Sequence, residues 1–230
     1  MKRIIAGCFI YFAFLIVTLP ASFLDSIFSH YSGGALRVTN AQGTLWHGSA
    51  TLGINGVDAG RYAWKIRLLE LMLGRLHVAF DSGADIVLKP AGLEMKHVSV
   101  ELPASALSLL GKELASIRPS GLLKIRSDEF AFSKHSSGTL TADWENAASP
   151  LSNVNPLGSY RVTVNGEGEA LRISLDTLKG PLRLTGSGLW SDKSGFRFNG
   201  TGESAEPGIS GLLRIAGRDM GGGKYALRVP

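Results

Sequence analysis

The chain has 230 residues, of which 44% are hydrophobic and 19% are charged, and its net charge is +5. The 24 Lys and Arg residues form no dense block, so the composition gives no sign of a nucleic-acid partner. The one cysteine, Cys8, lies in an apolar run near the N-terminus. The rest of the chain therefore excludes a disulfide, a Cys-based zinc site and a cysteine nucleophile.

The first predicted element is a membrane anchor at the N-terminus. Lys2 and Arg3 precede an uncharged run of 21 residues, from Ile4 to Leu24. A helix that rises about 1.5 Å per residue needs roughly 20 residues to cross the hydrocarbon core of a bilayer. We therefore expect residues 1–24 to form a short cytoplasmic tip and a transmembrane helix.

Two other interpretations of this run stay open. A cleaved secretory signal has an apolar core of about 7–15 residues, followed by small residues at its cleavage site. Here Leu19 or Pro20 would occupy a position that needs a small residue, which favours a retained anchor. The third interpretation is a buried helix of a soluble protein.

The distribution of positive charge predicts the orientation of this anchor. Lys2 and Arg3 lie before the apolar run, and the next Lys or Arg after it is Arg37. Since positive residues favour the cytoplasmic side, we expect a cytoplasmic N-terminus and residues from about 25 to 230 on the far side. No second uncharged run approaches spanning length, which predicts a single-pass protein.

From residue 25 onward, the dominant pattern is the alternation of apolar and polar residues that is typical of half-buried strands. The clearest alternating segments are 76–80, 98–102, 160–164, 171–175, 182–185 and 196–199. Turn-forming residues separate them, among others Asn55-Gly56, Asn165-Gly166 and Gly221–Gly223. Helical periodicity is confined to 103–117 and 68–73. We therefore expect a mainly β fold, an elongated antiparallel sheet with one or two short helices.

Similar residues recur in the two halves of this β-rich part. Gly43 matches Gly121 at an offset of 78 residues, and Trp64 matches Trp144 at an offset of 80. This weak internal repeat predicts two similar meander units, covering 25–118 and 119–230. The other interpretation is that two β meanders share such marks by chance.

The sequence carries no recognisable catalytic or metal-binding constellation. None of the five histidines has a second histidine three or four residues away, and neither an H-E-x-x-H nor a G-x-S-x-G motif occurs. His77 and His97 fall on the polar side of predicted strands, so we expect both to be solvated. We therefore expect no catalytic, metal or cofactor-binding residue, no cofactor and no enzymatic activity.

Two sets of residues are candidates for contacts with a partner or with lipid. Arginines on the polar side of successive predicted strands could form a basic stripe, or they could be ordinary solvated side chains. These are Arg161, Arg172, Arg183 and Arg197. Tryptophans at or near strand ends could pack in the core or form the wall of an apolar groove. These are Trp46, Trp64, Trp144 and Trp190.

Several short motifs then follow one another along nearly the whole chain. They are G-T-L-W-H-G-S-A at 43–50, Tyr62-Ala63-Trp64, Leu73-Gly74, P-L-G-S-Y at 156–160 and G-P-L-R-L-T-G-S-G-L-W at 180–190. With the N-terminal anchor, their order and spacing resemble the protein N family of the bacterial type II secretion system. The resemblance implies a Gram-negative inner-membrane protein with a periplasmic domain. It also implies an accessory role in exporting folded proteins from the periplasm across the outer membrane.

We therefore expect a periplasmic β-rich interaction module, tethered to the inner membrane, whose partners are other type II secretion components. The alternative is an inner-membrane-anchored module that binds or bridges phospholipid through an apolar groove. A third hypothesis, an enzyme such as a cell-wall hydrolase, lacks any set of acid, base or nucleophile residues.

Overall fold

The computed structural model describes residues 11, 14–206, 208–209, 213–214 and 217–229, and it confirms a mainly β protein with a few short helices. Fourteen strands belong to one antiparallel sheet, in which the strands follow one another in sequence order up to β12. There β12 pairs with β14, and β13 pairs with the other side of β14. The alternating pattern therefore predicted the fold class correctly.

Part of the expected membrane anchor lies outside the described residues. Within 4–24, positions 4–10, 12 and 13 are not described. Among the residues that the structure does describe, no helix is long and apolar enough to span a membrane.

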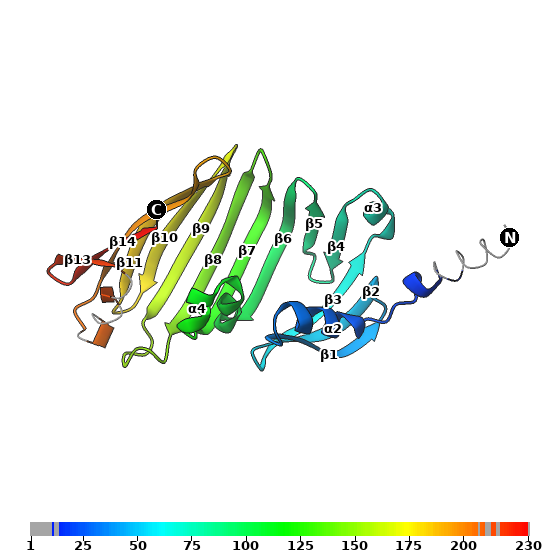
Figure 1. The fold of residues 1–230 in the computed structure, drawn as a ribbon, viewed down its shortest axis with the longest axis horizontal. Coiled ribbons are helices and arrows are strands. Elements are labelled where there is room, and N and C mark those ends of the chain that lie inside the picture. Colours follow the sequence, from blue (N-terminus) through cyan, green and yellow to red (C-terminus); the bar gives the residue numbers. More distant parts are fainter. Residues whose placement is uncertain (1–10, 12–13, 207, 210–212, 215–216, 230) are drawn as a thin grey trace. The chain divides into compact units, whose positions relative to one another are not determined.

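The chain divides into two compact units, Met1–Asp85 and Ile86–Pro230. The first contains α2 (Phe23–Tyr31), β1 (Leu36–Gly43), β2 (His47–Ile54), β3 (Val57–Ile66), α3 (Leu68–Met72) and β4 (Leu76–Phe80). After β5 (Asp85–Lys89), the second contains β6 (Gly92–Pro103), the 3₁₀ helix η1 (Ala104–Leu110), α4 (Lys112–Ser116), β7 (Ser120–Phe132), β8 (Ser137–Ala148), β9 (Gly158–Glu167), β10 (Ala170–Lys179), β11 (Arg183–Ser191), β12 (Gly195–Glu203), β13 (Arg218–Gly221) and β14 (Lys224–Val229) (Figure 1).

The first unit is held together by a small apolar core beneath α2. Ala21, Val38, Ala50 and Trp64 are all buried in one cluster, and Phe28 of α2 packs against it. Because these residues come from α2 and from β1 to β3, the cluster fixes the helix on the sheet.

Side chains of α2 and of the residue that follows it accept hydrogen bonds from backbone N–H groups at the outer edge of β1. The Asp25 carboxylate accepts a hydrogen bond of 2.8 Å from the backbone N–H of Val38, and Ser32 Oγ accepts one of 2.8 Å from that of Leu36. The same Asp25 accepts two bonds of 3.0 Å from Arg37. Backbone donors that would otherwise attract another strand are therefore satisfied.

The core of the second unit joins strands that are far apart in the sheet order. Its buried members are Ala147, Leu157, Tyr160, Leu182, Ile209, Leu213 and Tyr225. Tyr160 lies on β9 and Tyr225 on β14, with three strands between them in the sheet. The sheet must therefore curl toward its apolar side for the two to share one cluster. Burial also raises the pKa of the Tyr160 phenol, whose hydroxyl donates a hydrogen bond of 3.1 Å to the Leu182 carbonyl.

The helix expected over 103–117 is wrong as one continuous element. Pro103 ends β6, η1 covers Ala104–Leu110, and α4 begins at Lys112. Gly111 between them is extended, with φ 167°. An extended residue cannot continue a helix, so the apolar periodicity is divided between two short pieces.

The turn expected at Asn165-Gly166 is also wrong, because both residues lie within β9. Gly166 instead lies where the neighbouring backbone leaves no room for a side chain. A Cβ atom on Gly166 would lie 2.3 Å from the backbone nitrogen of Ser137. The chain reverses two residues later, at Gly168, which has a positive φ of 64°.

The weak repeat has a counterpart in the strand register. Trp64 lies opposite Phe80 across β3 and β4, and Trp144 lies opposite Tyr160 across β8 and β9. In both pairs the aromatic partner comes sixteen positions later in the chain. The expected unit boundary near 118–121 lies at the start of β7, which begins at Ser120, whereas the two compact units divide between Asp85 and Ile86.

Candidate functional site

The polar side of the second unit carries charges of alternating sign. Residues that lie directly opposite one another across β6 to β10 form one row, which consists of Glu101, Lys124, Asp143, Arg161 and Asp176. Opposite charges that face each other across neighbouring strands stabilise a sheet. This row is therefore a structural feature of the sheet.

Asp143 is the buried centre of this row. Its side chain is 3% exposed and accepts hydrogen bonds of 2.6 and 2.8 Å from Arg161 Nε and Nη2, and a further bond from Arg126 Nη2. The hydrogen bonds from Arg161, followed by the attraction of both guanidinium groups, hold the Asp143 pKa below its ordinary value against the opposing effect of burial. A carboxylate that is buried and bound by two arginines is not available as a general acid or base.

Two of the four candidate arginines are engaged in ion pairs. Arg161 binds Asp143, as described above. Arg172 donates hydrogen bonds of 2.7 and 2.9 Å to the two carboxylate oxygens of Glu167. These contacts neutralise both arginines locally.

The other two candidate arginines lie on the same side of the sheet but in different positions. Arg183 lies opposite Glu203 at the start of β11, and Arg197 lies opposite Leu189. Leu189 also lies opposite Arg172, so Arg172 and Arg197 share a row with an apolar residue between them. The four arginines thus share one face without forming an uninterrupted row.

The tryptophans of the first unit serve its packing. Trp64 is buried, and its indole N–H donates a hydrogen bond of 2.9 Å to the Leu45 carbonyl. Trp46 donates one of 2.8 Å to the Ile16 carbonyl, which ties the β1–β2 connection to the residues before α2.

The tryptophans of the second unit lie on its apolar side. Trp144 packs 6.2 Å from the ring of Tyr160 and donates a hydrogen bond to the Ser120 carbonyl. Trp190 lies 5.1 Å from the ring of Phe132. Those two rings belong to β11 and β7, which would lie roughly 19 Å apart in a flat sheet with strands about 4.8 Å apart. Their contact shows a second place where the sheet curls around its apolar side.

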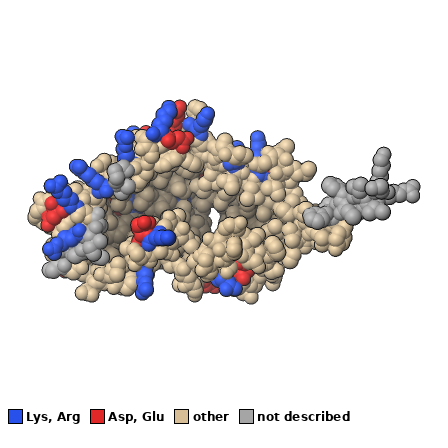
Figure 2. Space-filling view, in the orientation of Figure 1, with Lys and Arg blue, Asp and Glu red and all other residues tan. Residues whose placement is uncertain are grey.

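Between these two contacts, the apolar side of the second unit forms a shallow trough (Figure 2). One row crosses it in register from β8 to β12 and consists of Leu140, Val164, Ile173, Gly188 and Phe198. The next row consists of Ile125, Ala142, Val162, Leu175, Gly186, Gly200 and Leu227. Nearly all of these residues are half-buried. We name this surface the apolar trough; Figure 2 shows a hollow beside α4 whose visible floor has no charged side chain.

On the polar side, an irregularity in β6 and β7 creates a second hollow. The register of β7 against β8 shifts between Arg126 and Phe130, so that one extra residue forms a bulge in β7. On the neighbouring β6, His97 has a φ of 49°, a left-handed conformation that is uncommon for a residue other than glycine. The Ser127 hydroxyl is buried here and donates a hydrogen bond of 2.8 Å to the Thr139 carbonyl.

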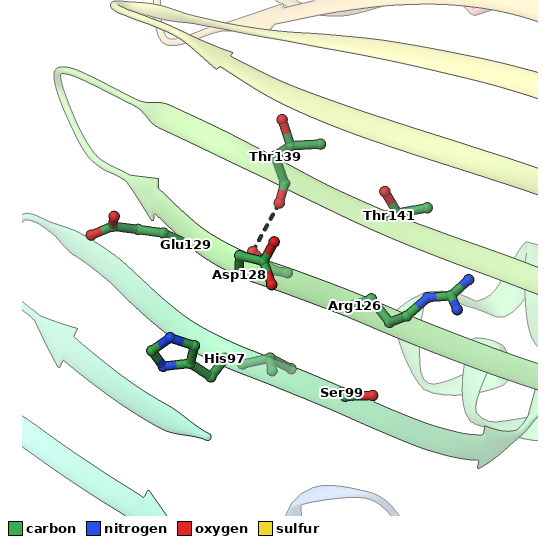
Figure 3. A pocket seen from close by; sticks show the side chains of 9 residues that line it. His97, Ser99, Arg126, Asp128, Glu129, Thr139 and Thr141 are labelled. Atoms are coloured by element: carbon green, nitrogen blue, oxygen red, sulfur yellow. Dashed lines mark hydrogen bonds between the residues drawn. The ribbon is translucent and has the colours of Figure 1, made fainter. Parts of the chain in front are cut away.

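The resulting bulge pocket has a volume of about 690 Å³ and is lined mainly by polar side chains (Figure 3). Within the described part of the chain, four of them have no hydrogen-bond or ion-pair partner: His97, Ser99, Asp128 and Thr141. The other charged lining residues are engaged, Glu129 with Lys96 at 3.3 Å and Arg126 with Asp143. The pocket therefore offers unused donors and acceptors to a partner.

Sequence reasoning did not find this pocket, although one signal was present. Ser127, Asp128 and Glu129 follow one another where the alternation of β7 calls for an apolar residue. Such an interruption is typical of a bulge. His97 gave no comparable signal, since its exposed position agrees with a regular strand.

His77 corrects another expectation, because it is 9% exposed and not solvated. Its Nδ1 lies 2.9 Å from Glu70 Oε1 and its Nε2 lies 2.9 Å from Asp85 Oδ1. The hydrogen bond from His77 is the main cause that lowers the pKa of Glu70, with smaller contributions from Arg67. Since the ring lies between the two carboxylates, this cluster joins α3, β4 and Asp85 within the first unit.

Comparison with known proteins assigns the family. The chain matches the family described as type II secretion system (T2SS), protein N, over residues 34–228. No curated protein and no solved structure matches the chain significantly. The match covers almost all of the β-rich part, including both faces described above. The chain therefore belongs to the type II secretion system protein N family and is a component of that system.

Proposed function

We propose that the chain is a non-catalytic component of the type II secretion system, anchored in the inner membrane, with its β-rich part in the periplasm. The observation that carries this proposal is the family match over residues 34–228. The uncharged run at 4–24, with Lys2 and Arg3 before it, supports the anchor and its orientation.

The role that we propose for the β-rich part is to bind other components of the secretion system through the bulge pocket. The pocket combines a carboxylate, an imidazole and two hydroxyls that have no partner within the described residues. Burying such groups is costly unless the partner supplies matching hydrogen bonds. The pocket therefore favours a polar protein surface over an apolar one.

This docking role can be tested by crosslinking in cells. A photoreactive amino acid in place of Asp128 should crosslink to another secretion component, whereas the same amino acid in place of Asn199 should not. Asn199 is the matched control because it is exposed on the same side of the sheet, on β12. Equal crosslinking at both positions, or none at Asp128, would contradict the assignment of the pocket.

The role in secretion and the topology need separate tests. Deleting the gene should reduce the amount of substrate that leaves the cell, and the full chain should restore it. A reporter enzyme that is active only in the periplasm should be active when fused after Val229 and inactive when fused before Lys2. Unchanged secretion would contradict the role, and the opposite reporter pattern would contradict the orientation.

A further inference from the structure

The short helix α3 of the first unit exposes its apolar side chains and turns its one charged side chain toward the sheet. Leu69 is 79% exposed, Met72 is 85% exposed, and Leu73, directly after the helix, is 74% exposed. Their spacing of three and four residues places them on one face of the helix. A surface helix normally buries such an apolar face against the core. In α3 this face points away from the protein, which marks it as a contact surface.

Glu70 holds α3 in this orientation from another side of the helix. Its Oε1 lies 2.9 Å from Nδ1 of His77, which is buried on β4, and Nε2 of the same ring lies 2.9 Å from Asp85 Oδ1. The backbone N–H of Arg67, just before the helix, donates a hydrogen bond of 3.1 Å to the His77 carbonyl. Turning α3 over to bury its apolar face would break these contacts, so the exposure of that face is built into the unit.

α3 lies at the end of the first unit from which the proposed anchor leaves. The indole N–H of Trp46 donates a hydrogen bond of 2.8 Å to the carbonyl of Ile16, which belongs to the uncharged run at 4–24. The backbone N–H of Ile66 donates one of 2.7 Å to the Trp46 carbonyl, and α3 begins two residues later, beyond the end of β3 (Figure 1). The end of the uncharged run and α3 are therefore joined through Trp46, so α3 lies near the bilayer wherever the anchor enters it.

The charges beside α3 fit a membrane surface. Arg75, which follows the helix, is exposed and has no ion-pair partner among the residues that the structure describes. Arg67 lies 3.3 Å from Glu70, so that pair contributes little net charge. A basic group beside an apolar face is typical of helices that lie in the membrane interface. The cation stays with the phosphate headgroups while the apolar side chains enter the acyl boundary.

The small size of the apolar face argues against a protein as its occupant. A stable interface between proteins takes about 20–30 residues on each side. The helix is only five residues long, and its exposed face offers three apolar side chains. A bilayer needs no matched surface, because each apolar side chain that leaves water for the acyl boundary gains free energy by itself.

We propose that Leu69, Met72 and Leu73 insert into the interfacial layer of the membrane from which the anchor emerges, with Arg75 at the level of the headgroups. This second point of contact restricts the tilt of the first unit, which a single tether leaves undetermined. The inference rests on the anchor in the proposed function. It is independent of the bulge pocket, which belongs to the second unit.

Spin labels can measure the depth of single positions in the full chain, reconstituted at low density in vesicles of phosphatidylcholine and phosphatidylglycerol. Met72→Cys carries the label on α3 and Val57→Cys is the matched control, both combined with Cys8→Ser. Val57 is an exposed apolar residue at the other end of the β2–β3 hairpin. At position 72 we expect more collisions with oxygen, which concentrates in the bilayer, than with a water-soluble nickel complex. At position 57 we expect the reverse.

The two collision rates distinguish the possible surroundings of α3. A label at position 72 that meets the nickel complex as often as the label at position 57 lies in water and would overturn the proposal. A label shielded from both reagents lies against protein, either a second copy or another part of the chain, and would also overturn it.

A label on the native Cys8 of the otherwise unchanged chain tests the anchor separately. If the Cys8 label lies in the bilayer while the label at position 72 lies in water, the anchor stands and this inference fails. If the Cys8 label itself lies in water, the proposed anchor fails, and this inference fails with it.

A second measurement asks whether the apolar face causes the insertion. Leu69→Ser combined with Leu73→Ser, in the chain labelled at Met72→Cys, should lower the oxygen collision rate and raise that of the nickel complex. The control combines Tyr31→Ser with Val57→Ser, two exposed apolar residues elsewhere in the first unit, and should leave both rates unchanged. Equal rates in the two double variants would overturn the proposal. Circular dichroism checks that both fold.

Discussion

Among single residues, Asp143 shows how the polar side of the sheet is stabilised. Its carboxylate is almost fully buried between Arg161 and Arg126. Asp143→Asn should lower the free energy of unfolding by about 1–3 kcal/mol, because hydrogen bonds to a charged buried acceptor are lost. Urea unfolding of the full chain measures the change. Asp192→Asn, at an exposed turn position, is the control and should lie within about 0.5 kcal/mol of wild type.

The same residue predicts how stability depends on pH. Because Arg161 and Arg126 lower the pKa of Asp143 in the folded state, folding favours the ionised form. This contribution is complete above the ordinary carboxyl range, near pH 4, and is lost as the pH falls through the lowered pKa of the folded state. Wild type should therefore lose more stability than Asp143→Asn between pH 5 and the acid end of the titration. Parallel losses in both proteins would contradict this assignment.

Gly166 occupies a position in β9 that has no room for a side chain. Gly166→Ala should destabilise the second unit by more than about 2 kcal/mol, because the new Cβ would lie 2.3 Å from the Ser137 backbone nitrogen. Gly53→Ala is the matched control, since its Cβ would meet nothing closer than 3.8 Å. Thermal unfolding of the two variants provides the comparison. Similar melting temperatures would show that the β7–β8 turn can move aside.

Among the elements, β1 is the exposed edge that the protein protects with a neighbouring helix. Asp25→Ala removes the acceptor for the Val38 N–H and the partner of Arg37. We expect faster hydrogen exchange at Val38 and a concentration-dependent oligomer, because an unpaired edge recruits further strands. Exchange mass spectrometry and size-exclusion chromatography measure these effects. Asp25→Asn keeps an oxygen acceptor for Val38 and should remain close to wild type; an oligomer in both variants would point to another cause.

The strands illustrate what local pattern can predict. Alternation identified β4 with its observed bounds, Leu76–Phe80, and it placed segments of β6, β9, β10 and β12 correctly. It succeeded because a half-buried strand needs a period of two. It missed the bulge at Ser127–Glu129 because a bulge depends on how two strands meet, and sequence alone does not show their register.

The candidate contact residues illustrate the same limit. Intervals between Arg161, Arg172 and Arg183 placed them on the polar face, but the intervals could not show that Asp143 and Glu167 lie within reach of the first two. Nor could the sequence show that Trp190 meets a ring from β7, because that contact depends on the curl of the sheet. Pairing and curvature are properties of the assembled sheet, so they lie beyond a strand-by-strand reading.

For the whole molecule, the proposed anchor and the proposed docking surface depend on each other. A tether confines the β-rich part to a thin layer beside the membrane, which raises its effective concentration toward other membrane-bound components. A surface of modest affinity, such as one polar pocket, is then sufficient.

Replacing residues 1–24 with a cleavable signal peptide tests this dependence. Secretion should fall at normal expression and recover when the released domain is overproduced, because added concentration compensates for the lost tether. An unrelated single-pass anchor of the same orientation is the matched control and should keep full secretion at normal expression. The assay is the amount of substrate outside the cell per amount of chain inside it. If the released domain is fully active at normal expression, the anchor has no role in partner search. If the unrelated anchor also fails, residues 1–24 make specific contacts, and tethering alone does not explain their role.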